Sequence, residues 1–342
     1  MHHPLSYCFP LKRVPARPLL TPGHFHPGWL LVGFAVGLGR SLAKPRLAST
    51  ARTASLGGIM DSKPSDSIDT PASIAARLHL AVKIAEEAGK LTLRYFREPQ
   101  LQIDHKADDS PVTIADREAE TLLRKRIGEQ FPEDAIIGEE FDNTDGNTDF
   151  CWVLDPIDGT KSFIHGVPLY TTLVAVLKEQ VPVAGVIHAP ATGETVYASS
   201  GQGCWYVEAN RHPDPPQPAR VSKVSDLSKA LVLTSDVRSH AQHRTPDALD
   251  DYLKLENMAR MGRTWGDAYG YLLVATGRAD AMIDPIVNLW DVAAIQPVIE
   301  EAGGRFCDWK GVATVHSGES IATNKHLAEA VLAIMGGSKP RP

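Results

Sequence analysis

The sequence lacks the cysteine patterns that stabilise small secreted domains or bind zinc. Its four cysteines, Cys8, Cys151, Cys204 and Cys307, lie far apart, and none belongs to a C-x-x-C pair. Neither a disulfide framework nor a structural zinc site is predicted, and the thiols are expected to be reduced or buried. The 13 histidines include no H-E-x-x-H arrangement, so a histidine metal site is not indicated either.

An excess of positive charge is also missing. The 342 residues carry a formal net charge of -6, and 43% of them are hydrophobic. A chain of this length and composition can bury a large core, as one large domain or two smaller ones. Nucleic acid is not a predicted partner, because no basic surplus is available to neutralise its backbone. Gly33, Gly37 and Gly39 lack the fingerprint spacing, which disfavours a dinucleotide-binding oxidoreductase.

Acidic residues are absent before Asp61, whereas Lys and Arg are scattered there among Ser, Pro, Gly and Ala. This composition predicts that residues 1–59 are an organelle transit peptide, removed in the mature protein and directing it to the plastid (chloroplast) stroma. Residues 29–39 form an apolar run that is too short to span a membrane but long enough for the apolar region of a secretory signal. A bipartite or secretory route, like a mitochondrial one, is the less favoured alternative. Translation from Met60 is a third interpretation.

The remaining sequence predicts two halves on either side of a proline-rich connector at residues 212–218. The half at 60–216 is predicted to be α+β, with helices that start after Thr70 and at Ile114 and an antiparallel meander. The half at 217–342 is predicted to be α/β, with Pro297 kinking its last helix. The predicted helices are 71–96, 114–127, 264–277 and 292–302, and the predicted strands are 135–137, 151–154, 169–177, 181–188, 194–198, 204–207, 230–234 and 279–283.

Carboxylates are concentrated at the ends of these predicted elements. Asp155 and Asp158 sit on an expected sharp turn after a buried strand, the pair Glu139 and Glu140 follows another strand, and Asp291 begins a helix. Each could simply cap a turn or a helix, or face solvent. Together they would repel one another unless a cation neutralised them, and hard oxygen ligands select magnesium or a similar ion. With the adjoining residues 159–160 able to offer amides to an anion, the set favours a metal-phosphate site.

The motifs of this region resemble those of the inositol monophosphatase family, and the resemblance extends from about residue 74 to 335. It rests on 138–140 (Gly-Glu-Glu), 155–160 (Asp-Pro-Ile-Asp-Gly-Thr), 290–294 (Trp-Asp-Val-Ala-Ala) and 301–304 (Glu-Ala-Gly-Gly). The resemblance implies a layered α-β-α-β-α sandwich of the inositol-monophosphatase and fructose-bisphosphatase type. It also implies magnesium-dependent hydrolysis of small phosphate monoesters, sensitivity to lithium, a homodimer, and no membrane attachment of the mature form.

The resemblance also implies a role for each matching residue. Asp116 and Thr160 would pair to orient and deprotonate the attacking water, and the amides of Gly159 and Thr160 would bind phosphate. Glu140 would lie behind the metal ligands, and Lys106 either adds charge near the site or is solvated. The implied ligands of two or three magnesium ions are Glu139, Asp155, the carbonyl of Ile157, Asp158 and Asp291.

The C-terminal half resembles the histidinol-phosphate phosphatase branch of the family in residues 263–271 and 282–288. Histidinol phosphate carries an ammonium and an imidazole, so carboxylates beside the ester make physical sense. Asp284 is the expected ammonium partner, and Asp267, Asn288 and Arg263 are further candidate contacts. The alternatives are that Asp267 caps its helix or hydrogen-bonds within it, and that Trp265 and Tyr269 are core aromatics. Inositol monophosphatase activity, or a catalytically inactive metal-binding regulatory protein, are the other functions considered.

Overall fold

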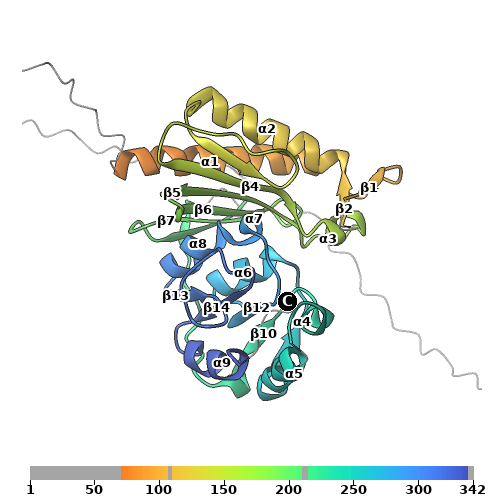
Figure 1. Ribbon diagram of the computed structural model, residues 1–342, viewed down its shortest axis with the longest axis vertical. Coiled ribbons are helices and arrows are strands. Elements are labelled where there is room, and N and C mark those ends of the chain that lie inside the picture. Colours follow the sequence, from red (N-terminus) through yellow and green to blue (C-terminus); the bar gives the residue numbers. More distant parts are fainter. Residues whose placement is uncertain (1–70, 107–109, 210–214, 246, 338–342) are drawn as a thin grey trace, which may run out of the picture. The chain divides into compact units, whose positions relative to one another are not determined.

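The computed structural model describes residues 71–106, 110–209, 215–245 and 247–337 (Figure 1). The chain divides between Lys63 and Pro64 into two units, and all of these residues belong to the second. The predicted leader at 1–59, the candidate start at Met60 and the expected helix cap at Thr70 lie outside the described residues.

The larger sheet has seven strands, and the predicted meander forms most of it. β3 and β4 run parallel, and the other neighbouring strands are antiparallel. Every residue of β4 is buried, which explains why its first five residues form a continuous apolar run. In spatial order the strands are β3 (Ala135–Gly138), β4 (Phe150–Asp158), β5 (Thr171–Lys178), β6 (Val181–Ala189), β7 (Glu194–Ser199), β8 (Cys204–Glu208) and β9 (Gln217–Pro218).

A second sheet of five strands comes from the C-terminal part of the chain, and a separate hairpin precedes both sheets. β10 is parallel to both of its neighbours, whereas β14 is antiparallel to both of its own. The order is β11 (Met261–Arg263), β10 (Leu231–Leu233), β12 (Ala281–Asp284), β14 (Ser320–Asn324) and β13 (Gly304–Cys307), and the hairpin is β1 (Ile103–His105) with β2 (Pro111–Thr113).

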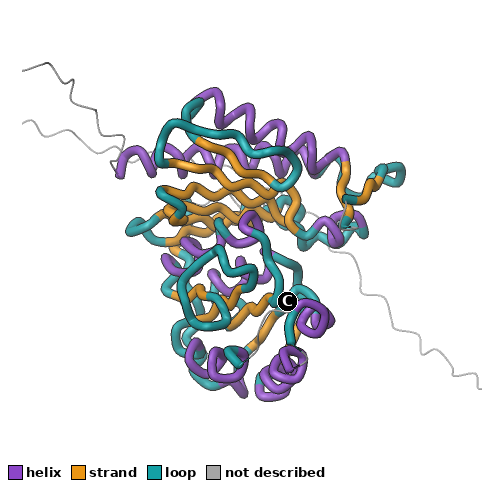
Figure 2. Tube along the Cα trace, in the orientation of Figure 1, coloured by secondary structure: helices purple, strands orange, loops and turns teal. Residues whose placement is uncertain are grey.

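Helices separate and cover the two sheets in layers (Figures 1 and 2). α1 (Pro71–Thr92) and α2 (Ile114–Gln130) pack on one face of the larger sheet. α6 (Ala268–Ala275) and α8 (Ile295–Glu301) lie between the sheets, with α7 (Leu289–Val292) beside them. The smaller sheet is covered on its other side by α4 (Val237–His243), α5 (Asp247–Met258) and α9 (Ala328–Met335), while the short elements α3 (Thr160–Ile164) and η1 (Leu227–Lys229) lie in connections.

This arrangement is an α-β-α-β-α sandwich, so the predicted fold class is confirmed. Neighbouring side chains of β4 show how both faces of the larger sheet are buried: Val153 joins the core between the two sheets, whereas Trp152 and Leu154 join the core under α1 and α2. Cys151, Cys204 and Cys307 are buried free thiols, as expected. No helix among the described residues is long and apolar enough to cross a membrane.

All four predicted helices have different bounds in the structure, and the second, predicted at 114–127, runs to Gln130. The first ends at Thr92 and continues as turns towards Phe96. The helix expected at 264–277 begins only at Ala268, because Gly266 takes a left-handed conformation (φ 75°) in the preceding loop. The helix expected at 292–302 is two helices, α7 and α8. Pro297 lies in the first turn of α8, where its missing N–H needs no helical partner, so it causes no kink.

The larger sheet ends with β9, close to the predicted boundary between residues 216 and 217. The core between the sheets takes side chains from both predicted halves, including Leu173 from β5 and Ile299 from α8. The division into 60–216 and 217–342 stays a prediction about domains.

Candidate active site

The carboxyl end of β4 supplies two of the predicted metal ligands. Asp155 and Asp158 were predicted to lie on a sharp turn after the strand, and this was wrong: β4 continues through Asp158, with a register shift against β5 between the two acids. The irregularity changes which way the strand presents its side chains. The chain turns one residue later, at Gly159, which has φ 81° and precedes α3.

Asp291 reaches the same place from the second half of the chain. It is the third residue of α7, and its Oδ2 accepts a 2.6 Å hydrogen bond from the backbone N–H of Asn288. The junction of α7 and α8 lies against β6, because a Cβ added to Gly185 would overlap the carbonyl oxygen of Ala294. Glycine at this position therefore allows the segment carrying Asp291 to approach the sheet.

Asp155, Asp158 and Asp291 each offer a carboxylate oxygen to one point, since these oxygens lie within 4.8 Å of one another. Asp158 is oriented through Oδ2, which accepts hydrogen bonds from the hydroxyl of Thr171 (2.9 Å) and the N–H of Ala268 (2.7 Å). Asp155 Oδ1 is buried and has no hydrogen-bond partner among the described residues. An orphaned buried oxygen of this kind is costly unless a cation or a proton satisfies it.

The pKa values of these acids also show that their negative charges are unfavourable in this buried place. Burial, followed by the charges of Glu139, Asp158 and Asp291, raises the pKa of Asp155 well above its usual value. Burial, followed by the charges of Asp267 and Asp291, does the same to the pKa of Asp158. The pKa of Asp291 rises to about 7, chiefly through burial. A hard divalent cation fits this set, because it would neutralise the charges and ligate the orphaned oxygen.

Glu139 and Glu140 follow β3 and share one basic partner. The ammonium of Lys106 lies 2.6 Å from Glu139 Oε1 and 2.8 Å from Glu140 Oε1. Lys106 therefore adds positive charge near the site and is not simply solvated. Burial raises the pKa of Glu140 to about 7. The N–H of Glu140 donates to Glu120 Oε2 (2.8 Å), and this buried acid of α2 was not recognised in the sequence. Glu139 lines the cavity described below, whereas Glu140 does not.

The implied pair of Asp116 and Thr160 is not hydrogen-bonded in the described structure. Asp116 Oδ2 accepts from the N–H (2.8 Å) and the hydroxyl (2.6 Å) of Thr113, forming a capping box at the start of α2. The Thr160 hydroxyl donates to the carbonyl of Ile157 (3.1 Å), which keeps a second lone pair for another partner. Burial raises the pKa of Asp116 to about 6, so its carboxylate remains available as a base at neutral pH.

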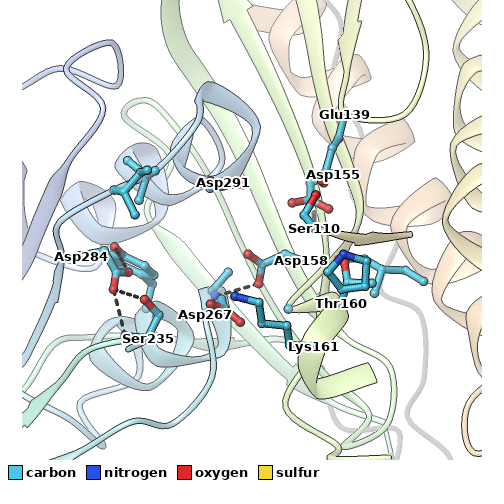
Figure 3. Close-up of a pocket in the computed structure, with 17 residues that line it drawn as sticks. Ser110, Glu139, Asp155, Asp158, Thr160, Lys161, Ser235, Asp267, Asp284 and Asp291 are labelled. Carbon is cyan, nitrogen blue, oxygen red and sulfur yellow. Dashed lines mark hydrogen bonds between the residues drawn. The ribbon is translucent and has the colours of Figure 1, made fainter. Parts of the chain in front are cut away.

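A cavity of about 170 Å³ opens beside the acidic cluster (Figure 3). Asp155, Asp158 and Asp291 line it together with Asp267 and Asp284 from the C-terminal half. Its remaining lining residues are Ser110, Pro111, Glu139, Ile157, Gly159, Thr160, Lys161, Ser235, Ala268, Tyr271, Ile286 and Val287.

Asp284 is buried at the end of β12 and held by several donors. Its Oδ1 accepts from the N–H (2.9 Å) and the hydroxyl (2.7 Å) of Ser235, and its Oδ2 accepts from the hydroxyl of Tyr271 (2.7 Å). Asp267 precedes α6, but its side chain makes no capping hydrogen bond. Burial raises the pKa of both acids, that of Asp267 to about 6. Asp267 is thus the N-cap residue of α6 by position, but its side chain does not cap the helix.

The other two candidate substrate contacts lie outside the cavity lining. Arg263 is exposed, and its guanidinium donates to the neighbouring carbonyl of Gly262 (2.6 Å). Asn288 is the N-cap of α7, so its structural role is to orient Asp291. Trp265 is 39% exposed and is not a core aromatic, whereas Tyr269 is buried as that interpretation expected.

Four polar residues of the lining were missed by the sequence analysis: Ser110, Lys161, Ser235 and Tyr271. Two signals were readable. Lys161 directly follows the Asp-Pro-Ile-Asp-Gly-Thr motif, and Tyr271 lies four residues after Asp267, on the same face of a helix. Ser235 follows β10, at the carboxyl end of a parallel strand, where α/β sheets commonly form their sites.

The layered sandwich thus carries an acidic cavity in which three carboxylates could hold a metal ion. The inositol monophosphatase family model matches residues 75–338. A histidinol-phosphatase of Chlorobaculum parvum is 40% identical over 263 residues, covering 77% of this chain and 97% of the relative. The chain belongs to the inositol monophosphatase family and is a phosphoric monoester hydrolase.

Two further relatives illustrate the range of similarity. The chloroplastic bifunctional phosphatase IMPL2 of Arabidopsis thaliana is 33% identical over 255 residues, covering 74% of this chain and 69% of the relative. Among solved structures, an inositol monophosphatase from Zymomonas mobilis superposes with a TM-score of 0.66 at 31% identity, covering 77% of this chain and 98% of that chain.

Proposed function

We propose that the chain is a magnesium-dependent histidinol-phosphate phosphatase, which converts L-histidinol phosphate and water to L-histidinol and phosphate in histidine biosynthesis. The observation that carries the proposal is that Asp267 and Asp284 line the same cavity as the metal-type cluster, by which we mean Asp155, Asp158 and Asp291. A substrate with a phosphate at one end and an ammonium near the other matches this distribution of charge. The histidinol-phosphatase of Chlorobaculum parvum supports the same substrate.

In this proposal two or three magnesium ions would be held by four carboxylates and the carbonyl of Ile157. When bound, magnesium neutralises the phosphate dianion and lowers the pKa of the attacking water. The carboxylates are those of Glu139, Asp155, Asp158 and Asp291.

The chain's own residues then bind the ester and handle the proton. The amides of Gly159 and Thr160, at the start of α3, would bind phosphate oxygens. Asp116 and the Thr160 hydroxyl would orient the attacking water and take its proton, which requires the hydroxyl to turn away from the Ile157 carbonyl. The cavity side of Asp284 would receive the ammonium, while Ser235 and Tyr271 keep its carboxylate in place.

Inositol monophosphatase activity is the second candidate. It is supported by the family match and by the similarity to the Zymomonas mobilis enzyme. The same metal ligands would serve both reactions, so the pocket around Asp267 and Asp284 has to distinguish the alcohols.

Residues 1–59 would direct the protein to the plastid stroma. Their composition and the chloroplastic relative from Arabidopsis thaliana support this destination. We further propose that the mature protein is a homodimer, as the family resemblance implies.

Asp284→Ala tests the proposed substrate. We expect kcat/KM for histidinol phosphate to fall at least tenfold more than kcat/KM for phenyl phosphate, because only the first ester carries an ammonium. Asp250→Ala, which removes an exposed acid of α5, is the matched control and should change neither value. Equal losses on both esters in Asp284→Ala would remove Asp284 from the specificity role.

A further inference from the structure

The cavity contains one basic side chain among many acids. Of the described residues that line it, only Lys161 carries a positive charge. The acids that share the lining are Glu139, Asp155, Asp158, Asp267, Asp284 and Asp291. An ammonium in such a place experiences a strong negative field, so its partner in the working enzyme determines how the cavity treats charged substrates.

Lys161 extends from the start of α3 along the cavity wall towards Asp267 (Figure 3). Its ammonium makes no hydrogen bond with the other described residues that line the cavity (Figure 3). Its charge nevertheless acts on Asp267, where it lowers the pKa against the opposing effects of burial and of Asp284. The Asp267 carboxylate also lies close to the phosphate-binding turn, since a Cβ added to Gly159 would be 2.9 Å from its Oδ2.

The two acids of the C-terminal half differ in how their charge is satisfied. Asp284 is held by neutral donors, the amide and hydroxyl of Ser235 and the hydroxyl of Tyr271. These bonds orient the carboxylate but leave its negative charge in the cavity. Asp267 instead shares the cavity lining with Lys161, which extends towards it (Figure 3) and whose charge lowers its pKa. We call the part of the cavity around Asp267, Asp284 and Lys161 the alcohol pocket, because it would receive the alcohol part of the ester. Once cations neutralise the four proposed metal ligands, these three side chains set the charge of the alcohol pocket.

We propose that Lys161 is the counter-ion of Asp267 and thereby a specificity-determining residue, so that Asp284 is the single carboxylate left to receive a substrate ammonium. This inference rests on the proposed function, because it assigns Asp284 the same role. Lys161 gives the alcohol pocket a net charge of one negative unit, which matches an ester carrying one ammonium. Without Lys161 the pocket would attract an ammonium more strongly and repel the phosphate of every ester equally.

The test compares histidinol phosphate with 3-(imidazol-4-yl)propyl phosphate, the same ester without the amine. In Lys161→Met, the ratio of kcat/KM for the amine ester to that for the amine-free ester should rise about fivefold, because a second uncompensated carboxylate faces the ammonium. Lys161→Arg keeps the charge and should leave the ratio within about twofold of the wild type. Adding Asp267→Asn to Lys161→Met should return the ratio to the wild-type value.

Other outcomes overturn the proposal. Equal losses on both esters in Lys161→Met would mean that Lys161 contacts the phosphate, and an unchanged enzyme would mean that this lysine is only solvated. Lys125→Met, at an exposed position of α2, controls for the loss of a surface charge.

Failure of the proposed function has a different signature, namely a wild-type enzyme that does not hydrolyse histidinol phosphate. The counter-ion role is then tested with 4-(aminomethyl)phenyl phosphate and phenyl phosphate. The same rise of the ratio is expected in Lys161→Met, and a constant ratio contradicts the proposal.

Discussion

Asp155 illustrates how a buried carboxylate can lower the stability of the folded protein. Its Oδ1 has no partner in the described structure, and both burial and three neighbouring acids oppose its ionisation. Such a group stabilises the protein only through what it binds. The metal-type cluster is therefore expected to reduce stability when no cation is present.

Asp155→Asn should consequently stabilise the protein in EDTA at pH 8, by about 1 kcal/mol, because it removes a buried charge. The same substitution should lower kcat more than about a hundredfold and abolish the rise in melting temperature that we expect magnesium to give the wild type. Thermal unfolding with and without magnesium measures both effects, with Asp250→Asn as the exposed control. A variant that is less stable in EDTA yet still stabilised by magnesium would refute the assignment.

At the scale of secondary-structure elements, the contact between β6 and the junction of α7 and α8 positions Asp291. The contact is close enough that a Cβ at Gly185 would overlap the Ala294 backbone. A backbone carbonyl cannot rotate away as a flexible side chain can, so relief requires α7 to move. A shift of about 1 Å in a ligand-bearing segment is costly for catalysis.

Gly185→Ala should therefore destabilise the protein by about 1–3 kcal/mol and lower kcat/KM at least tenfold. Gly128→Ala in α2 is the matched control: nothing lies within 4 Å of the added Cβ, and alanine favours a helix. This control should be neutral or up to about 1 kcal/mol more stable, with unchanged activity. Urea unfolding and phosphate release measure the pair, and an active, stable Gly185→Ala would contradict the positioning argument.

The elements also show what local pattern can and cannot predict. The meander was predicted to within a few residues, because its buried strands form apolar runs separated by turn residues. The course of β4 through Asp158 was not, since the irregularity depends on pairing with β5. α5 was overlooked although Ala248, Tyr252 and Leu255 recur at helical spacing and are buried.

The acids of the candidate site could be named from their motifs, but their surroundings depend on tertiary contacts. No local pattern predicts that Asp284 accepts from Ser235 and Tyr271, or that Thr160 donates to Ile157. The exclusion of Arg263 from the cavity likewise follows from where β11 lies in the smaller sheet. The acids of the candidate site were therefore easier to predict from the sequence than the residues that surround them in the cavity.

At the scale of the whole molecule, stability depends on joining α1 to the larger sheet. His188 of β6 lies at this junction, where a Cβ on Gly89 would be 2.5 Å from its ring. Its Nδ1 is 2.8 Å from the Thr195 hydroxyl. Burial, followed by the charge of Lys90, lowers the pKa of His188 to about 4.

Because the folded pKa lies below the value near 6.5 expected when unfolded, His188 contributes stability above about pH 6.5 that is lost as the pH falls towards 4. The contribution lost between pH 7.5 and pH 5 is about 2 kcal/mol. His188→Gln should be less stable at pH 7.5, yet lose about 2 kcal/mol less than the wild type on moving to pH 5. Urea unfolding in EDTA at both pH values measures this difference. Parallel losses would show that His188 does not drive the acid sensitivity.

The cavity combines residues of β4 with residues of α6 and β12, which lie more than a hundred positions later in the chain. Specificity is thus a property of how the two sheets come together around one acidic cavity. The most direct measurement is phosphate release by the purified protein with magnesium, comparing kcat/KM for L-histidinol phosphate and inositol 1-phosphate. We predict at least a hundredfold higher kcat/KM for histidinol phosphate. An equal or greater kcat/KM for the inositol ester would contradict the proposed function.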